Sequence, residues 1–448
     1  MNKQIIYNAT IVNDGVQYTG YVTVVGDLIA KVGCGAPSVS ELESADTLYD
    51  LQGKYLMPGV IDDQVHFRDP GLTHKADIAT ESAAAVAGGV TSFMDMPNTI
   101  PQTTTLEALE DKYAIAAEKS LANYSFYIGA TNENLNELKS VDYSKTCGVK
   151  LFLGASTGNM LVNSEGALDA IFAEVPALIA IHSEDEGVIQ RNKGLYTSKF
   201  GDSLPIHFHP MIRSAEACYV STAKAVERAD KYGTQLHVLH ISTAKEMALL
   251  SNAPLNEKRI TAEVCVHHLW FTDNDYSAYG NRIKWNPAIK TYADREALRD
   301  GLRSGKIDIV ATDHAPHTVE DKRGDVLKAA SGGPLVQFSL VAMLEMVNRG
   351  IFTMNQVVNK MSHAPADLYG VVGRGYIREN YKADLVVVES GVQNYVERED
   401  ILSKCGWSPF EGEVFHNRVC RTYVNGKIVF DKGEIMRDVR GERLLFNK

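Results

Sequence analysis

Side chains suited to metal or acid–base chemistry follow a series of apolar, strand-like segments. Three are histidines, and a lysine, an asparagine and an aspartate complete the set: His66, Asn98, Lys150, His182, His240 and Asp313. Imidazole and carboxylate groups are ligands that Zn²⁺ and similar borderline metals prefer in proteins. If the strands lie side by side, the set converges on one place and predicts a metal site.

The segment IDDQVHFRDPG, residues 61–71, carries the first of these histidines and an unusual neighbour. Two histidines separated by one residue at a strand end would point the same way and hold one metal ion together. Here Gln64 takes the first place and His66 the second. A neutral amide is a weaker zinc ligand than imidazole. Gln64 is therefore a neighbour of the predicted metal site whose role stays open, in either an altered metal hydrolase or a protein that has lost its chemistry.

Each residue of the set also has a purely structural alternative. A single histidine at a strand end is more often a hydrogen-bonded structural residue than a ligand. Lys150 lies among apolar residues, and taken alone it would simply reach the surface with its charged end. Asp313, in TDHAPH, would cap a turn. The metal interpretation depends on all of them falling at the same end of successive strands.

The elements that must position these residues alternate between strand and helix from residue 57 to residue 379. Short apolar runs are followed by helix-like stretches such as 77–89 and 216–233. This pattern predicts an α/β fold, a parallel (β/α)₈ TIM barrel whose chemistry lies at the carboxyl ends of the strands. The expected strands are GVIDDQVH, VTSFMDM, YSFYIGA, GVKLFL, LIAIHS, QLHVLHI, RITAEVC and IDIVATD.

Residues 1–56 and 380–448 follow a different pattern, in which apolar and polar residues alternate with a period of two. Turn residues interrupt the alternation, and Asn425-Gly426 is a hairpin signal. We expect the two ends of the chain to pair into one small β-sandwich domain. The barrel, residues 57–379, would then be inserted between the two halves of that domain.

The net formal charge of -11 argues against nucleic acid or an anionic membrane as a partner, because such partners require a basic face. An anionic small molecule would have to be held by local cations. The six cysteines are scattered without metal-binding spacing, which is typical of thiols in a reducing compartment. With no secretory signal pattern and no long apolar run, we expect a cytoplasmic protein.

Several long motifs in this order resemble the amidohydrolase superfamily, and more narrowly its dihydroorotase, allantoinase and hydantoinase group. The resemblance covers nearly the whole chain. Its motifs are PGVIDDQVHFRDPG, AAAVAGGVTSFMDMPNTIPQT, GVKLFLGASTGNM, IHSEDE, LHVLHISTA, TAEVCVHHLWFT, WNPAIK, ATDHAPHT and SGGP, with ADLVVVE and VNGKIV near the end.

The resemblance implies a role for each residue of the set. Lys150 would react with CO₂ to form a carbamate that bridges two Zn²⁺ ions, although one ion per subunit stays an alternative. His66, Lys150 and Asp313 would bind the first ion, and Lys150, His182 and His240 the second. Asp313 would also be the catalytic residue, accepting a proton from the attacking water and delivering it to the departing nitrogen. A homo-oligomer, a dimer or a tetramer, is also implied.

Three residues indicate the substrate. Arg68 would bind a carboxylate beside the metal, and Asn98 and His317 would add contacts. In the resembling group, dihydroorotases carry HFREPG with MPNT, whereas allantoinases tend to have Asn in place of the arginine. The sequence therefore favours interconversion of N-carbamoyl-L-aspartate and dihydroorotate. The alternatives are allantoinase or dihydropyrimidinase (hydantoinase) activity, a non-catalytic paralogue, and, for Arg68 alone, a loop salt bridge with Asp69 or Asp63.

Overall fold

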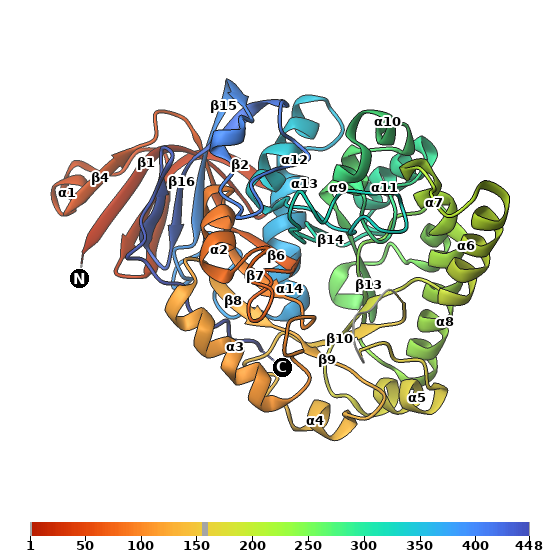
Figure 1. Cartoon of the computed structure of the whole chain (residues 1–448). Coiled ribbons are helices and arrows are strands. Elements are labelled where there is room, and N and C mark those ends of the chain that lie inside the picture. Colours follow the sequence, from red (N-terminus) through yellow and green to blue (C-terminus); the bar gives the residue numbers. More distant parts are fainter. Residues whose placement is uncertain (1, 155–159, 448) are drawn as a thin grey trace.

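The computed structural model describes residues 2–154 and 160–447. Its central feature is the expected barrel of parallel strands (Figure 1). The barrel strands are β6 (Val60–Val65), β7 (Val90–Asp95), β8 (Asn123–Phe126) with β9 (Ile128–Gly129), β10 (Val149–Phe152), β11 (Ile179–His182), β12 (Leu236–Val238), β13 (Ile260–Cys265) and β14 (Ile309–Ala311). Each of the eight segments predicted to be a barrel strand forms one, with β8 and β9 sharing the third.

Hydrogen bonds between neighbouring strands form the wall of the barrel as two sheets. Strands β9 to β14 form a six-stranded parallel sheet in chain order, and β6, β7 and β8 form a three-stranded one. A parallel bridge between Val65 and His314 joins the first strand to the last. The strands are buried on both faces, as in a filled barrel, which explains why they read as continuous apolar runs.

Helices follow the barrel strands and cover the outside of the barrel (Figure 1). The longer ones are α2 (Ile78–Ala87), α3 (Leu106–Lys119), α5 (Glu165–Glu174), α6 (Glu186–Phe200), α8 (Ala215–Tyr232), α11 (Tyr292–Ser304) and α12 (Ser339–Asn348). Short helices include α4 (Leu135–Ser140), α9 (Val266–Trp270), α13 (Met354–Val358) and α14 (Ala364–Tyr369). Asp77 caps α2 and Ser214 caps α8, each accepting from a backbone N–H in the first turn. None of the described helices is long and apolar enough to cross a membrane.

The two ends of the chain form one nine-stranded sheet beside the barrel (Figure 1). Its N-terminal strands are β1 (Lys3–Asn13), β2 (Val16–Val25), β3 (Leu28–Cys34), β4 (Thr47–Asp50) and β5 (Tyr55–Pro58). Its C-terminal strands are β15 (Leu385–Tyr395), β16 (Val414–Val424), β17 (Lys427–Asp431) and β18 (Glu434–Ile435). Antiparallel pairing of β5 with β15 joins the two halves, with Met57 opposite Val386.

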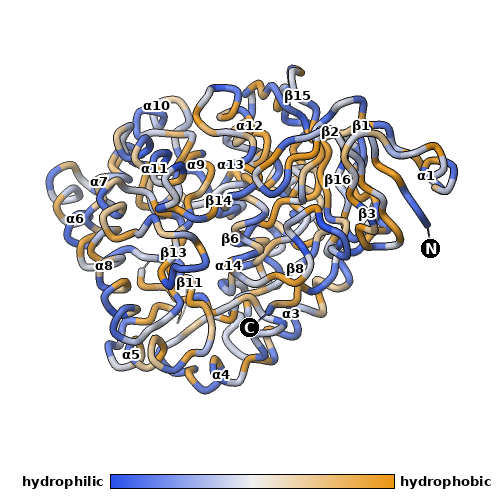
Figure 2. The backbone as a smooth tube through the Cα atoms, turned by 180° about the vertical axis from the view of Figure 1, so that it is seen from behind, coloured by the Kyte–Doolittle hydropathy of each residue, from blue (hydrophilic) through white to orange (hydrophobic). Residues whose placement is uncertain are grey.

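The predicted hairpin at Asn425-Gly426 connects β16 to β17. Asn425 and Gly426 have φ angles of 50° and 73°, the left-handed pair that a two-residue hairpin of this type requires. Figure 2 shows apolar residues concentrated in β1, β2 and β16. Val12 and Phe430 of the sheet share one buried cluster with Val90 and Phe93 of the barrel, so packing fixes the sheet against the barrel.

Candidate metal and substrate site

The residues predicted to do chemistry lie where the barrel strands end, and the backbone there is unusual. Arg68, His240 and Asp313 have positive φ angles of 68°, 40° and 47°. Non-glycine residues rarely adopt this conformation, and it clusters at functional sites. Gly71, with φ of 83°, completes the loop after β6, because a Cβ atom there would lie 1.9 Å from the carbonyl oxygen of Ile100. The local backbone is therefore shaped to direct these side chains.

The first group of site residues is built around His66. Its Nδ1 donates to Oδ1 of Asn98 at 2.7 Å, which leaves the lone pair on Nε2. That Nε2 atom lies 3.1 Å from Oδ1 of Asp313. Gln64 also approaches this oxygen, donating from Nε2 at 3.2 Å. The structure thus brings together His66, Asn98, Asp313 and Gln64 from three different barrel strands.

The second group joins the histidines that end β11 and follow β12. His182 donates from Nε2 to Oε2 of Glu184 at 3.0 Å, so its Nδ1 carries the lone pair. Nδ1 of His182 lies 3.0 Å from Nε2 of His240. Arg213 pairs with the same Glu184 oxygen at 2.5 Å. Burial lowers the pKa of His182 and holds the pKa of His240 well below its ordinary value, which favours the neutral form of both imidazoles.

Lys150, on β10, is 1% exposed, with its Nζ atom 4.6 Å from the centre of the Phe152 ring. Burial lowers the pKa of this lysine to about 7, against the opposing charges of Glu263 and Asp313. Its own charge acts on the second histidine group. Lys150 is therefore an interior amine whose neutral and charged forms are both populated near neutral pH, and it interacts electrostatically with both groups.

A divalent metal fits this arrangement of atoms. Two pairs of ligand-type atoms face each other at short distance: His66 Nε2 with Asp313 Oδ1, and His182 Nδ1 with His240 Nε2. In the first pair both atoms offer electron pairs, and such atoms repel at this distance unless they share a cation or a proton; in the second pair His240 can donate an N–H to His182. The acceptors Asn98 and Glu184 orient the rings from behind, as outer partners of metal-bound histidines do. The residues present therefore suit Zn²⁺ or a similar ion.

Beside the first group lies a cationic site formed by Arg68 and His317. Arg68 is 7% exposed and donates from Nε to the carbonyl oxygen of Pro316 at 3.1 Å. Its Nη2 lies 3.1 Å from Nε2 of His317, and Nζ of Lys75 lies 3.1 Å from Nδ1 of that ring. Burial and the charge of Arg68 hold the pKa of His317 well below its ordinary value. Asp321 lies 3.3 Å from Nζ of Lys75 and 3.5 Å from Nδ1 of His317, so Lys75 already has a carboxylate partner and Arg68 is the cation that could take an anion.

The loop salt bridge considered for Arg68 is not what the structure shows. Asp69 pairs with Lys119 at 2.9 Å, and Asp63 lies 3.3 Å from Nε2 of His237. The guanidinium instead contacts the segment that follows Asp313, at the carbonyl oxygen of Pro316 and the ring of His317.

Sequence reasoning missed two residues that support the site. Glu184 stands two positions after His182 in the motif IHSEDE. Residues two apart at a strand end point the same way, so this spacing could have predicted that Glu184 lies beside His182. Trp407 lies far away in the chain, within the segment assigned to the terminal β-domain. Its Nε1 donates to the backbone carbonyl oxygen of His317 at 2.8 Å. Nothing in the spacing of these two residues predicts that contact.

Another ligand-type group in the described chain lies deeper in the barrel and contains Asp63, His237 and Glu263. His237 lies 3.3 Å from Asp63 and 3.4 Å from Glu263, and all three side chains are buried. Burial alone would lower the pKa of His237, but the two carboxylates raise it to about 9. This group is accounted for as a buried ion-pair network in which a charged imidazole neutralises acidic side chains.

Cys265, His267 and His268 form a further compact group at the end of β13. His268 donates from Nε2 to the carbonyl oxygen of Pro287 at 3.1 Å. His267 stacks on Trp285 with ring centres 4.5 Å apart. Both ring nitrogens of His267 and Nδ1 of His268 are buried without a hydrogen-bond partner among the described residues, and we assign this group no ligand.

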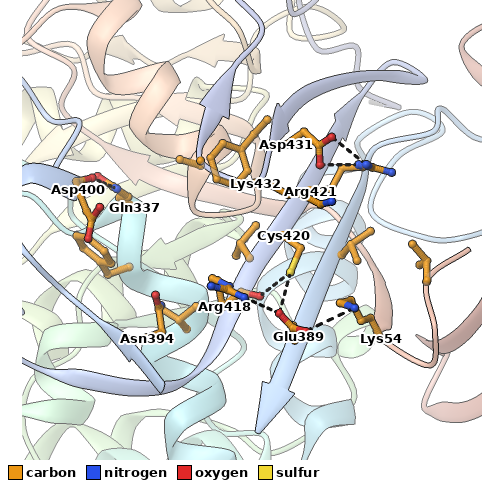
Figure 3. Close-up of a pocket in the computed structure, with 18 of the residues that line it drawn as sticks. Lys54, Gln337, Glu389, Asn394, Asp400, Arg418, Cys420, Arg421, Asp431 and Lys432 are labelled. Carbon is orange, nitrogen blue, oxygen red and sulfur yellow. Dashed lines mark hydrogen bonds and ion pairs between the residues drawn. The ribbon is translucent and has the colours of Figure 1, made fainter. Parts of the chain in front are cut away.

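A cavity of about 1000 Å³ lies elsewhere, between the terminal sheet and α12 (Figure 3). Five of its charged side chains pair with one another: Glu389 contacts Lys54 and Arg418, and Asp431 contacts Arg421. Among the described residues that line it, none belongs to the predicted site. The barrel mouth is therefore the better candidate for the chemistry.

Comparison with known proteins agrees with this geometry. The sequence profile of the Amidohydrolase family matches residues 55–429. The dihydroorotase of Methanosphaera stadtmanae is 31% identical over 403 residues, 89% of this chain and 90% of that protein. The dihydroorotase of Pediococcus pentosaceus is 33% identical over 441 residues, 96% of this chain and 99% of that protein. Among solved structures, L-hydantoinase (dihydropyrimidinase) from Arthrobacter aurescens is similar with a TM-score of 0.92 at 27% identity, over 99% of this chain and 100% of that one.

Proposed function

Because the chain belongs to the amidohydrolase family, we propose that it is a metal-dependent dihydroorotase. It would interconvert N-carbamoyl-L-aspartate and dihydroorotate, with loss or gain of one water. The observation that carries this proposal is the buried guanidinium of Arg68, held by Pro316 and His317 beside the His66–Asp313 pair. Dihydroorotate is a cyclic amide with a carboxylate, and this cation is placed to bind that carboxylate while the ring amide faces the metal ligands.

We assign the metal ligands as His66, Lys150, His182, His240 and Asp313. A bound divalent metal supplies a water of lowered pKa and polarises the amide carbonyl. The low pKa of Lys150, about 7, supports its reaction with CO₂, which only a neutral amine undergoes. In that reaction the nitrogen of the neutral amine bonds to the carbon of CO₂ and loses one proton to solvent, so a carbamate anion replaces a neutral amine.

The protein's own groups would then handle the proton and the substrate. Asp313 is the general base in hydrolysis: it accepts the proton of the attacking water and delivers it to the ring nitrogen that departs. Its φ of 47° and the hydrogen bond from Gln64 orient the carboxylate for this exchange. Arg68, with Asn98 and His317 beside it, binds the substrate carboxylate and fixes which ring amide faces Asp313.

Hydantoinase or dihydropyrimidinase activity is the second candidate, since the likeness to the Arthrobacter aurescens L-hydantoinase covers the whole barrel. The two candidates differ in one requirement: dihydroorotate has a carboxylate that needs a cation to bind it, and the substrates of the second candidate have none at that position. A non-catalytic role is disfavoured because Asn98 and Glu184 still orient the rings of His66 and His182. A homo-oligomeric state and a cytoplasmic location stay predictions.

The deciding experiment compares purified, zinc-supplemented protein on dihydroorotate, dihydrouracil, hydantoin and allantoin. We expect dihydroorotate to be the best substrate, and Arg68→Gln to raise its KM by about 10- to 100-fold through loss of charged hydrogen bonds. The same variant should leave slow turnover of dihydrouracil unchanged. Arg191→Gln, at an exposed position on α6, is the matched control.

Three results would reject the dihydroorotase proposal. Faster turnover of dihydrouracil or hydantoin than of dihydroorotate would favour the second candidate. An Arg68→Gln variant with unchanged KM for dihydroorotate would remove the carboxylate contact on which the proposal rests. Absence of turnover for all four substrates in protein that retains zinc would favour the non-catalytic alternative.

A further inference from the structure

Gln64 stands where a second histidine would complete the ligand set, and its backbone is linked through Asp62 to that of Thr312, the residue before Asp313. Asp62 accepts from the backbone N–H of Gln64 at 3.3 Å and from that of Thr312 at 3.2 Å. The hydroxyl of Thr312 donates to the other oxygen of Asp62 at 2.6 Å. Position 64 on β6 and position 313 after β14 are thus held in register with each other by one buried carboxylate.

The orientation of the Gln64 amide is defined by partners at both ends. Its Nε2 donates to Oδ1 of Asp313 at 3.2 Å, and its Oε1 accepts from the thiol of Cys265 at 3.7 Å. Gln64 is 1% exposed, so the loss of either partner would leave a buried polar atom unsatisfied. An amide nitrogen has no lone pair available for a metal. To act as a ligand, Gln64 would have to turn its oxygen toward Asp313 and break both contacts.

The two halves of the proposed metal centre are therefore unequal. The first half has one imidazole of its own, His66, and one carboxylate, Asp313. The second half has two imidazoles whose nitrogens already face each other at 3.0 Å, with Glu184 behind one of them. Nδ1 of His240 has no hydrogen-bond partner among the residues described, and its ring is 2% exposed. Lys150 would serve both halves, so they differ in their own ligands: two imidazoles in the second half, against one imidazole and one carboxylate that already accepts from Gln64 in the first.

We propose that Gln64 is a positioning residue for Asp313 and not a metal ligand, so that this chain keeps one tightly bound divalent ion, at the imidazole pair of His182 and His240, with Lys150 shared by both halves. An ion in the first half is weakly held and exchanges with the solution. The inference rests on the proposed metal centre, but it makes no assumption about the substrate. The inference therefore holds or fails independently of whether the substrate is dihydroorotate or another cyclic amide.

The test is a metal count on the intact zinc-supplemented protein after dialysis against metal-free buffer, by atomic emission. We expect about one zinc per wild-type chain and about two in Gln64→His, because the imidazole completes the first set. Gln64→Leu, which has a similar size but neither donor nor acceptor, should keep about one zinc. The matched control is Gln393→His, an exposed position on β15, which should also keep about one.

A second measurement separates positioning from a general structural effect. In Gln64→Leu, we expect kcat for the best cyclic amide substrate to fall about 10- to 100-fold with little change in KM, because Asp313 loses a partner that orients it. The zinc count of the same variant should stay at the wild-type value. A parallel fall in zinc content and in kcat would show that Gln64 is a ligand and overturn the proposal.

Other outcomes also overturn it. About two zinc ions per wild-type chain after dialysis, with one lost in Gln64→Leu, would place Gln64 among the ligands. An unchanged count in a folded Gln64→His variant would show that the missing imidazole does not limit the first position. If Gln64→His fails to fold, the zinc count of the wild-type protein still tests the proposal, because about two zinc ions per chain would contradict it.

Discussion

Trp407, in the C-terminal segment, donates its indole N–H to the backbone carbonyl oxygen of His317 at 2.8 Å. His317 in turn contacts the guanidinium of Arg68, so a residue between strands of the terminal sheet supports the proposed carboxylate site in the barrel. Trp407 is 4% exposed and also lies over the ammonium group of Lys322. The terminal segment thus forms part of the wall of the site.

Replacement of Trp407 by phenylalanine should weaken binding of the carboxylate. The variant keeps the ring but leaves the carbonyl oxygen of His317 without its donor, a loss of about 1–2 kcal/mol. We expect KM for dihydroorotate to rise about 5- to 30-fold, with kcat changed less. Steady-state kinetics on dihydroorotate and dihydrouracil would show the difference. Trp270→Phe, on α9, is the control; equal effects of both substitutions, or equal effects on both substrates, would contradict the prediction.

Uptake of CO₂ by Lys150 should depend on pH in the metal-free protein. Carbamate formation requires the neutral amine, and burial lowers the pKa of Lys150 to about 7. Protonated amine predominates below that pH and neutral amine above it. We therefore expect carbamate to increase as the pH rises from about 6 to about 8 in bicarbonate buffer.

NMR of isotopically labelled bicarbonate would measure this uptake directly. Lys150→Arg is the control, because a guanidinium stays charged over this range and does not react. Signal that persists in the Lys150→Arg protein, or that is constant across the pH range, would refute the assignment of the reactive amine.

Glu184 should determine how long a metal ion stays bound. Its Oε2 atom accepts from Nε2 of His182 and thereby keeps the lone pair on the nitrogen that faces His240. Glu184→Gln replaces this acceptor with a neutral amide, and loss of an outer partner of this kind weakens metal binding about 10- to 100-fold. Zinc transfer to a coloured chelator would report the change. Glu186→Gln, two residues later, should behave as wild type, and an equal effect of the two substitutions would exclude the assigned role.

Glu81, on α2, should stabilise the fold around the site. Its carboxylate is buried and accepts from Nε2 of His314 at 2.7 Å, from the hydroxyl of Ser403 at 2.6 Å and from the backbone N–H of Lys404 at 3.0 Å. Glu81→Gln turns an N–H toward one of these donors and should cost about 2–4 kcal/mol of unfolding free energy. Thermal unfolding would show a lower midpoint. Glu107→Gln, exposed in the first turn of α3, should leave the midpoint unchanged; a Glu81→Gln midpoint equal to wild type would contradict the prediction.

Much of the architecture follows from local patterns. Strands buried on both faces read as short apolar runs, so β6 to β14 were recognisable one by one, and their regular alternation with helices implied a parallel barrel. In such a barrel every strand carries its carboxyl end to the same face, so His66, His182, His240 and Asp313 were predicted to be neighbours although they are far apart in sequence. The hairpin at Asn425-Gly426 was predictable because its backbone requires left-handed residues.

The sequence by itself therefore determined the barrel, the pairing of the two chain ends into one sheet, and the set of side chains at the barrel mouth. It did not determine how those side chains face one another. The amide of Gln64 is oriented by Asp313 and Cys265 from two other strands, and Arg68 is oriented by Pro316 and His317. These contacts form between segments that are far apart in the sequence. The hydrophobic period and the order of the strands fix where a residue lies along its strand. Which of its atoms faces the site is decided by the side chains packed around it in the folded barrel.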